Sequence, residues 1–131
     1  MSKLVCDASA LVALLLDSGP DGEWAAGTVA GADLAAPALL DWEAANIMRR
    51  QEMAGFVSSD QTAQAHADLL DLAIERWPYP LLADRSWQLR ANLSVYDASY
   101  VALAELLHTP LITLDSKMSR APGVACRVLT P

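Results

Sequence analysis

The chain has 131 residues, of which 53% are apolar and 19% charged, and its formal net charge is −7. This composition excludes a disordered chain, and the length corresponds to a single domain over residues 1–131. The acidic balance argues against a protein that coats nucleic acid by bulk electrostatics, because that binding depends on Lys and Arg neutralising phosphates. It does not exclude a nucleic-acid enzyme whose acids gather cations, since bound cations reverse the local field.

The cysteines and the N-terminal apolar stretch indicate in which cellular compartment the protein is found. Cys6 and Cys126 lie in apolar runs near opposite ends of the chain without Cys-X-X-Cys spacing, which favours free thiols in a reducing compartment. Asp7 interrupts the first apolar run, and the stretch from Ala8 to Leu16 is too short to span a bilayer. We therefore expect a soluble, cytoplasmic protein with no membrane contact.

Strands and helices are predicted to alternate in the first half of the chain. The unbroken apolar run at its start is typical of a strand buried on both faces of a parallel sheet. Asp7 and Ser9 can cap the helix that follows. The predicted elements are a strand at 3–6, a helix ending near 19–20, a short helix at 23–30, a strand at 34–36 and a longer helix between 37 and 55.

The second half continues the same alternation. The predicted elements are helices at 58–76, 84–91 and 94–105, strands at 79–82, 111–114 and 125–130, and a short turn or helix at 117–120. Strands that alternate with helices predict an α/β fold, a three-layer α/β/α sandwich around a mainly parallel five-stranded sheet.

Acidic residues follow two of the predicted strands where each one ends. Asp7 comes directly after the first strand, and Asp115 comes directly after the strand at 111–114. Ligands bind at the carboxyl ends of strands in open α/β sheets, so these carboxylates meet if the two strands are neighbours. Asp97 and Glu43, each near the start of a predicted helix, are expected to open toward the same edge. Taken singly, each acid is better explained as a helix cap or a solvated loop residue, but together they indicate one site.

Clustered carboxylates need a positive partner. Their charges repel one another and raise each other's pKa unless a cation joins them. No histidine lies near these acids in the sequence. A ligand set made only of oxygen atoms suits a hard ion such as Mg²⁺ or Mn²⁺ rather than zinc.

Four stretches of the chain resemble the signature blocks of a known family. They are VCDASALVALLL, PALLDWEAANIM, YDASYVALAELL and PLITLDSKMSRAPG. In order and spacing they are similar to the blocks of PIN-domain ribonucleases, and most of all to the VapC toxins of bacterial toxin–antitoxin pairs. The resemblance runs nearly end to end, although residues 57–93 carry little of the signature.

The resemblance implies roles for particular residues. The family's four acids are matched by an acidic quartet, Asp7, Glu43, Asp97 and Asp115. Through the resemblance, the three aspartates are expected to be the main metal ligands, while Glu43 binds the ion directly or through a metal-bound water. The polar residues expected to orient these carboxylates are Ser9, Asn46 and Thr113.

The resemblance also implies an activity and partners. It implies a PIN-like fold and a Mg²⁺- or Mn²⁺-dependent endoribonuclease that hydrolyses phosphodiester bonds in structured RNA and so inhibits translation. The implied partners are a cognate VapB-like antitoxin and a second copy of the chain in a homodimer. Because no quartet position is substituted, nothing in the sequence suggests an inactive member.

Basic side chains near the quartet are candidates for contact with RNA or an antitoxin. These candidates are Arg50, Arg85, Lys117 and Arg120. Arg50 is the strongest, because its spacing of seven residues from Glu43 places both on one helix face. The alternative for each is a charge on a solvated helix face.

Two other functions fit parts of the pattern. A receiver-like signalling domain also binds Mg²⁺ at the strand ends of a doubly wound sheet, with Asp84 as its phospho-acceptor. Such a site needs paired acids after the first strand, but Asp7 is followed by Ala8, and two quartet acids would have no role. A catalytically inactive PIN-like interaction module is the other alternative, and the intact quartet disfavours it.

Overall fold

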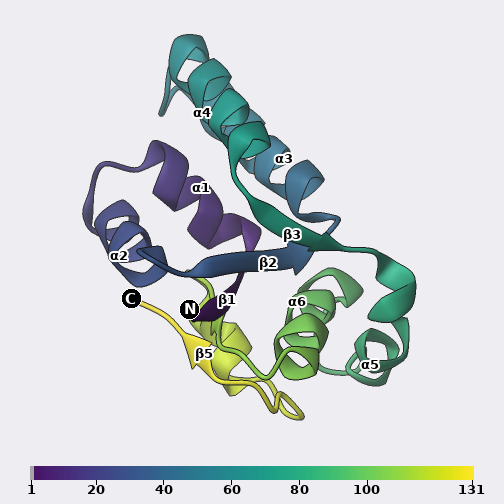
Figure 1. The fold of residues 1–131 in the computed structure, drawn as a ribbon. Helices are drawn as coiled ribbons and strands as arrows, with labels where there is room; N and C mark the ends of the chain where they lie inside the picture. Colours follow the sequence, from purple (N-terminus) through teal and green to yellow (C-terminus); the bar gives the residue numbers. More distant parts are fainter. Residues whose placement is uncertain (1) are drawn as a thin grey trace.

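A parallel five-stranded sheet forms the centre of the computed structural model, which describes residues 2–131 (Figure 1). The strands are β1 (Lys3–Cys6), β2 (Asp33–Pro37), β3 (Ile74–Trp77), β4 (Leu111–Ile112) and β5 (Val128–Leu129). Their order across the sheet is β3-β2-β1-β4-β5, and every neighbouring pair is parallel. The predicted α/β class with a five-stranded parallel sheet is confirmed.

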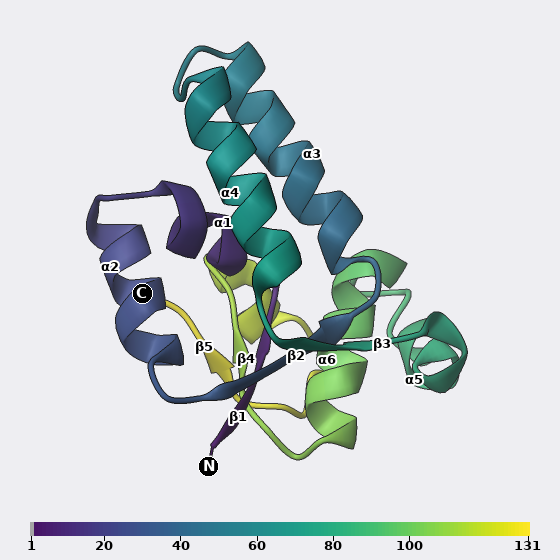
Figure 2. The ribbon, with the colours of Figure 1, turned by 45° about the horizontal axis from the view of Figure 1, so that its top comes forward.

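Helices cover both faces of the sheet and complete the predicted three layers (Figures 1 and 2). One face carries α1 (Ala8–Leu16), α2 (Pro20–Val29), α3 (Leu40–Met53) and α4 (Ser59–Asp71). The other carries α5 (Ala83–Gln88) and α6 (Val95–Leu106), and 3-10 turns occur as η1 (Tyr79–Leu81) and η2 (Ser116–Arg120). Right-handed crossovers explain this division, because the chain moves outward from β1 to β3 and then returns across the sheet to β4. In the described part of the chain, every helix falls short of the length and apolarity that a membrane crossing requires.

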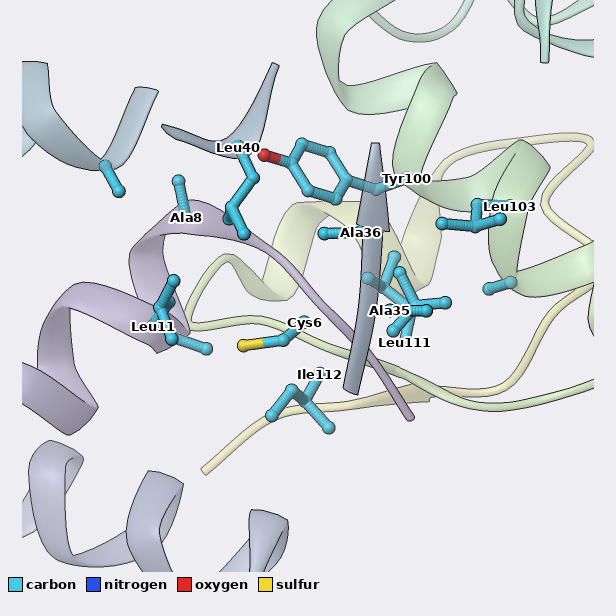
Figure 3. Packing of buried hydrophobic residues seen from close by; sticks show 14 of the residues in the cluster. Cys6, Ala8, Leu11, Ala35, Ala36, Leu40, Tyr100, Leu103, Leu111 and Ile112 are labelled. Atoms are coloured by element: carbon cyan, nitrogen blue, oxygen red, sulfur yellow. The ribbon is translucent and has the colours of Figure 1, made fainter. Parts of the chain in front are cut away.

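The core lies between the sheet and the helices on each face (Figure 3). Its side chains include Leu11 of α1, Leu40 at the start of α3, and Leu103 of α6, all fully buried. The middle of α6 is buried on nearly every side, since it packs against β1, β2 and β4 as well as α5. Burial of this kind fixes α6 as a rigid support at the centre of the molecule.

The third strand was predicted in the wrong place. The helix expected over 58–76 ends at Asp71, and Ile74–Trp77 pairs with β2 as the edge strand β3. The segment at 79–82, predicted as a strand, forms the 3-10 turn η1 instead. Pro78 and Pro80 lack the N–H groups that a strand ladder needs, which explains why pairing stops before them.

The cap at the start of α6 is a serine and not the acid of the quartet. Ser94 is the N-cap, and its Oγ accepts a hydrogen bond of 3.1 Å from the backbone N–H of Asp97. Asp97 therefore lies within the first turn rather than at the cap. Its carboxylate sits where the partial positive charge of the helix N-terminus favours an anion.

Two bidentate ion pairs fix the helices that flank the sheet edge. Arg76 of β3 donates to both carboxylate oxygens of Asp41 in α3, at 2.7 and 2.9 Å. Arg85 of α5 donates to both oxygens of Glu105 in α6, at 2.6 and 3.2 Å, and to the carbonyl of Gly123 at 2.7 Å. Such paired bonds are geometrically specific, so they hold the start of α3 and the end of α6 against the rest of the fold.

Candidate active site

The sheet changes winding direction between β1 and β4, and this is where the site forms. The chain leaves β1 toward β2 on one side and later returns to β4 on the other, so their boundary is a topological switch point. The two strands pair in parallel, and the backbone N–H of Asp7 donates to the carbonyl of Ile112 at 3.1 Å. The strands that precede Asp7 and Asp115 are therefore neighbours, which is the condition under which these two carboxylates were expected to meet.

All four acids of the quartet line one pocket at this edge, called the acid pocket below, with a volume of about 250 Å³. Asp7 follows β1 and Asp115 follows β4, while Glu43 and Asp97 stand in the first turns of α3 and α6. The remaining lining residues are Ala8, Ser9, Asn46, Ile47, Arg50 and Tyr100. Four segments distant in sequence thus contribute one carboxylate each.

Asp7 is the most firmly held member of the quartet. Its side chain is 7% exposed, and its Oδ1 accepts hydrogen bonds from the Ser9 hydroxyl at 2.7 Å and the Ala10 N–H at 3.0 Å. The Thr113 hydroxyl donates to the other oxygen, Oδ2. With donors on both oxygens, the carboxylate has one orientation, and its cap on α1 is the one predicted from the sequence.

The two hydroxyls also connect Asp7 to the Asp115 loop. Each hydroxyl donates its single proton to Asp7, so toward any other partner its oxygen can act only as a hydrogen-bond acceptor. The Ser9 Oγ accepts from the N–H of Leu114 at 3.1 Å, and the Thr113 Oγ1 accepts from the N–H of Asp115 at 3.0 Å. Ser9 and Thr113 therefore hold the Asp7 carboxylate and fix the loop that carries Asp115, while their predicted role in metal binding stays a prediction.

Tyr100 also lines the acid pocket, although the sequence analysis did not single it out. It is 1% exposed, and its hydroxyl donates to Oε1 of Glu43 at 2.7 Å. In Figure 3 the hydroxyl points toward the end of the core where Leu40 begins α3. The spacing of three residues from Asp97 on one helix is a signal that could have identified it, because such residues share a face.

The carboxylates influence each other electrostatically. Burial is the main cause that raises the pKa of Asp7, Glu43 and Asp97. Charge repulsion adds to each shift: the charge of Asp97 acts on both Asp7 and Glu43, and that of Asp115 acts on Asp97. Hydrogen bonds to Asp7 and Glu43 oppose these shifts. The pocket therefore concentrates negative charge where solvent screens it poorly.

The donor set suits a hard divalent cation. The pocket supplies carboxylate oxygens, a hydroxyl and an amide. Within residues 2–131, no three carboxylate, imidazole or thiol side chains are placed, as they stand, to hold a metal ion together. Mg²⁺ does not require three such side chains, because it keeps several waters and is commonly bound through one or two carboxylates. The mutual repulsion of the carboxylates is what a cation would relieve, so the residues fit the predicted ion.

The residues predicted to contact RNA or an antitoxin lie at different positions relative to the acid pocket, and only one of them lines it. Arg50 lines the acid pocket, as does Asn46, whose Oδ1 accepts from Arg49 at 3.5 Å. Lys117 and Arg120 lie exposed on η2, beyond Asp115, and their predicted contacts with RNA or an antitoxin stay predictions. The guanidinium of Arg85 is engaged by Glu105 within the fold, a structural role that the sequence analysis did not foresee.

Asp84, the phospho-acceptor of the receiver alternative, lies apart from the quartet. It is an exposed residue in the first turn of α5, whereas the acid pocket is formed by the ends of β1 and β4 with α3 and α6. The geometry therefore does not assemble the acids that a receiver would use.

Comparison with known proteins shows the family of the chain. The PIN domain family model matches residues 4–124. Ribonuclease VapC1 of Mycobacterium tuberculosis is 39% identical over 130 residues, covering 98% of this chain and 97% of the relative. Ribonuclease VapC9 of the same organism is 38% identical over 125 residues, covering 95% of each chain.

Solved structures show the same fold at low sequence identity. M. tuberculosis VapC20, described as a sarcin–ricin loop cleaving toxin, matches with a TM-score of 0.68 and 16% identity, covering 98% of this chain and 99% of that one. VapBC2 from Rickettsia felis, bound to a DNA fragment from its promoter, matches with a TM-score of 0.67 and 13% identity, covering 98% of each chain. Taken with the family model and the closely similar relatives, these findings show that the chain belongs to the VapC ribonucleases of the PIN-domain family.

Proposed function

We propose that this protein is a divalent-metal-dependent endoribonuclease that acts as the toxin of a toxin–antitoxin pair and inhibits translation by cutting structured RNA. The observation that carries the proposal is the convergence of four carboxylates from four segments on one pocket at the β1/β4 switch point. The names of the relatives, ribonucleases at 36–39% identity, support the same activity.

The quartet would hold the ion through carboxylate oxygens. Asp7, Asp97 and Asp115 are the proposed ligands, and Glu43 binds the ion either directly or through a water. A bound ion of this kind lowers the pKa of a coordinated water and stabilises charge on the phosphate. The hydroxyls of Ser9 and Thr113 keep the Asp7 carboxylate in one orientation, so it need not reorganise when the ion arrives.

Arg50 is the proposed phosphate contact of the site. Its exposed side chain lines the acid pocket beside Asn46, and within residues 2–131 it forms no ion pair with the quartet. A planar guanidinium can bind two phosphate oxygens at once. Arg50 thereby supplies positive charge to the RNA in a protein whose net charge is −7.

The partners of the chain are proposed from its relatives. Solved neighbours of the same fold include toxin–antitoxin complexes, such as one from Klebsiella pneumoniae with a TM-score of 0.64 and 22% identity. We propose that a VapB-like antitoxin binds this chain, that two copies form a homodimer, and that the protein acts in the cytoplasm, where its RNA substrate is.

RNA cleavage is expected to depend on added divalent metal. Purified protein incubated with tRNA and ribosomal RNA should produce discrete fragments with Mg²⁺ or Mn²⁺ and none with excess chelator, as gel electrophoresis of end-labelled RNA can show. An Asp115→Asn variant purified in the same way controls for contaminating nucleases. A wild type that produces no metal-dependent fragments beyond those seen with Asp115→Asn would refute the proposed function.

Replacing Tyr100 with phenylalanine is expected to lower kcat for RNA cleavage by about 10- to 100-fold, the usual cost of removing a group that orients a ligand. The ring keeps its packing in the core, but Glu43 loses the hydroxyl that donates to it. Tyr79→Phe is the matched control, because Tyr79 lies half-exposed on η1, outside the pocket. Equal kcat values for Tyr100→Phe and wild type would mean that this hydrogen bond has no role in cleavage.

A further inference from the structure

We propose that a groove beside the acid pocket binds an unpaired base of the RNA by stacking, an inference that rests on the proposed function. This aromatic groove is formed by Leu39, Trp42, Ala45, Arg49 and Tyr96 and has a volume of about 640 Å³. That volume lies within the roughly 300–1,000 Å³ of sites that hold small ligands.

The groove is continuous with the acid pocket. Glu43 and Asn46 line both. On α3, Trp42 directly precedes Glu43, and on α6, Tyr96 directly precedes Asp97. Consecutive helical residues are rotated by about 100°, so on each helix the acid lines the pocket and the aromatic residue before it lines the groove. An RNA phosphate held at the quartet would therefore place the adjoining nucleotide at the aromatic groove.

The lining has the chemistry of a base-stacking site. Trp42 is 74% exposed and Tyr96 is 64% exposed, so both rings are accessible to a ligand. Single-stranded RNA is recognised by stacking of its bases on such rings. Stacking also suits a chain of net charge −7, which cannot attract RNA through bulk electrostatics.

Arg49 adds a local positive charge to the groove. Within residues 2–131 it forms no ion pair, and its recorded side-chain contact is the 3.5 Å hydrogen bond to Asn46. A guanidinium in this state can bind the phosphate of the stacked nucleotide. The positive charge of Arg49 and the wall that the groove shares with the acid pocket favour RNA as the occupant. A second copy of the chain bound in the groove would also cover Glu43, which lines both the groove and the acid pocket.

The test measures RNA binding by variants of the groove. Fluorescence anisotropy would follow a fluorescein-labelled single-stranded RNA of random sequence, with Asp97→Asn in every protein so that the RNA stays intact. Trp42→Ala and Tyr96→Ala should each raise Kd by about 5- to 150-fold, the range for loss of one stacked base. Trp42→Phe, which keeps a ring, should change Kd by less than about threefold. Phe56→Ala is the matched control, since Phe56 is 80% exposed at the α3–α4 turn.

An abasic oligomer of the same length separates stacking from phosphate binding. It should bind equally to the proteins with and without Trp42→Ala, because it has no base to stack. Unchanged Kd values for Trp42→Ala and Tyr96→Ala with the random-sequence RNA would overturn the proposal. So would a loss of binding that follows conversion of a dimer to a monomer in light scattering, which would make the groove an interface between copies. If the Asp97→Asn protein binds RNA through the groove but the wild type cuts none, the proposed function fails while the groove proposal stands.

Discussion

Replacing Asp97 with asparagine is expected to reduce RNA cleavage by at least about a hundredfold, more than the loss of an orienting residue costs. The change removes one proposed ligand from the acid pocket but preserves the shape of the side chain. Ser94 still caps α6 through the backbone N–H of residue 97, so the helix should form normally. Cleavage rates with saturating Mn²⁺ give the loss directly. Full cleavage by Asp97→Asn would remove this residue from the site.

The same substitution should stabilise the metal-free protein by roughly a few degrees. Burial and the charge of Asp115 raise the pKa of Asp97 above its usual 3.8, so folding disfavours its ionised form. A group with a raised folded pKa contributes stability below its unfolded pKa and loses it as the pH rises through the folded pKa. In chelator, the melting temperature should therefore fall less steeply as the pH rises above about 4 for Asp97→Asn than for wild type. Asp84→Asn is the matched control, because Asp84 is an exposed acid in the first turn of α5.

Replacing Thr113 with valine is expected to cost both stability and activity. Thr113 is fully buried, and its hydroxyl donates to Asp7 while accepting from the N–H of Asp115. Valine removes a hydrogen bond to a buried charge, which costs about 1.5–3 kcal/mol in the free energy of unfolding. Because the Asp7 carboxylate loses an orienting donor, kcat should fall by about 10- to 100-fold. Urea denaturation and cleavage assays measure the two effects.

Thr109→Val provides a matched control at the opposite end of β4. Thr109 is also buried, but its hydroxyl donates to the neutral carbonyl of Lys3, so stability should fall and cleavage should not. In an Asp7→Asn background, Thr113→Val should cost less stability than in wild type, because the buried charge is absent. Equal costs in both backgrounds would show that the Thr113 hydroxyl does not act through Asp7.

The sequence predicted the parts of the site that depend on local pattern. The runs at 3–6 and 111–114 are mainly apolar and each is followed by an acid, so both the buried strands and the positions of Asp7 and Asp115 can be read from the chain. The hydroxyls of Ser9 and Thr113 were predicted through the family resemblance. The structure places both in contact with Asp7.

Features that depend on tertiary packing were not predicted. Tyr100 and Glu43 are 57 residues apart, and their hydrogen bond exists only because α6 and α3 meet at one end of the core. The edge strand β3 was assigned to a helix because the Ala- and Leu-rich segment before it has a helical pattern. Its pairing with β2, which the local sequence does not show, makes it a strand. The ring of Trp42 lines a groove beside the pocket, a position that depends on where α6 places Tyr96.

Mn²⁺ binding, measured by isothermal titration calorimetry, tests most directly whether the four acids form one metal site. The wild type should bind Mn²⁺, and Asp7→Asn, Asp97→Asn and Asp115→Asn should each weaken binding by at least about tenfold. Asp84→Asn should bind Mn²⁺ as the wild type does, because Asp84 lies outside the acid pocket. Affinity that stays at the wild-type level in all three quartet variants would contradict a metal site built by the quartet.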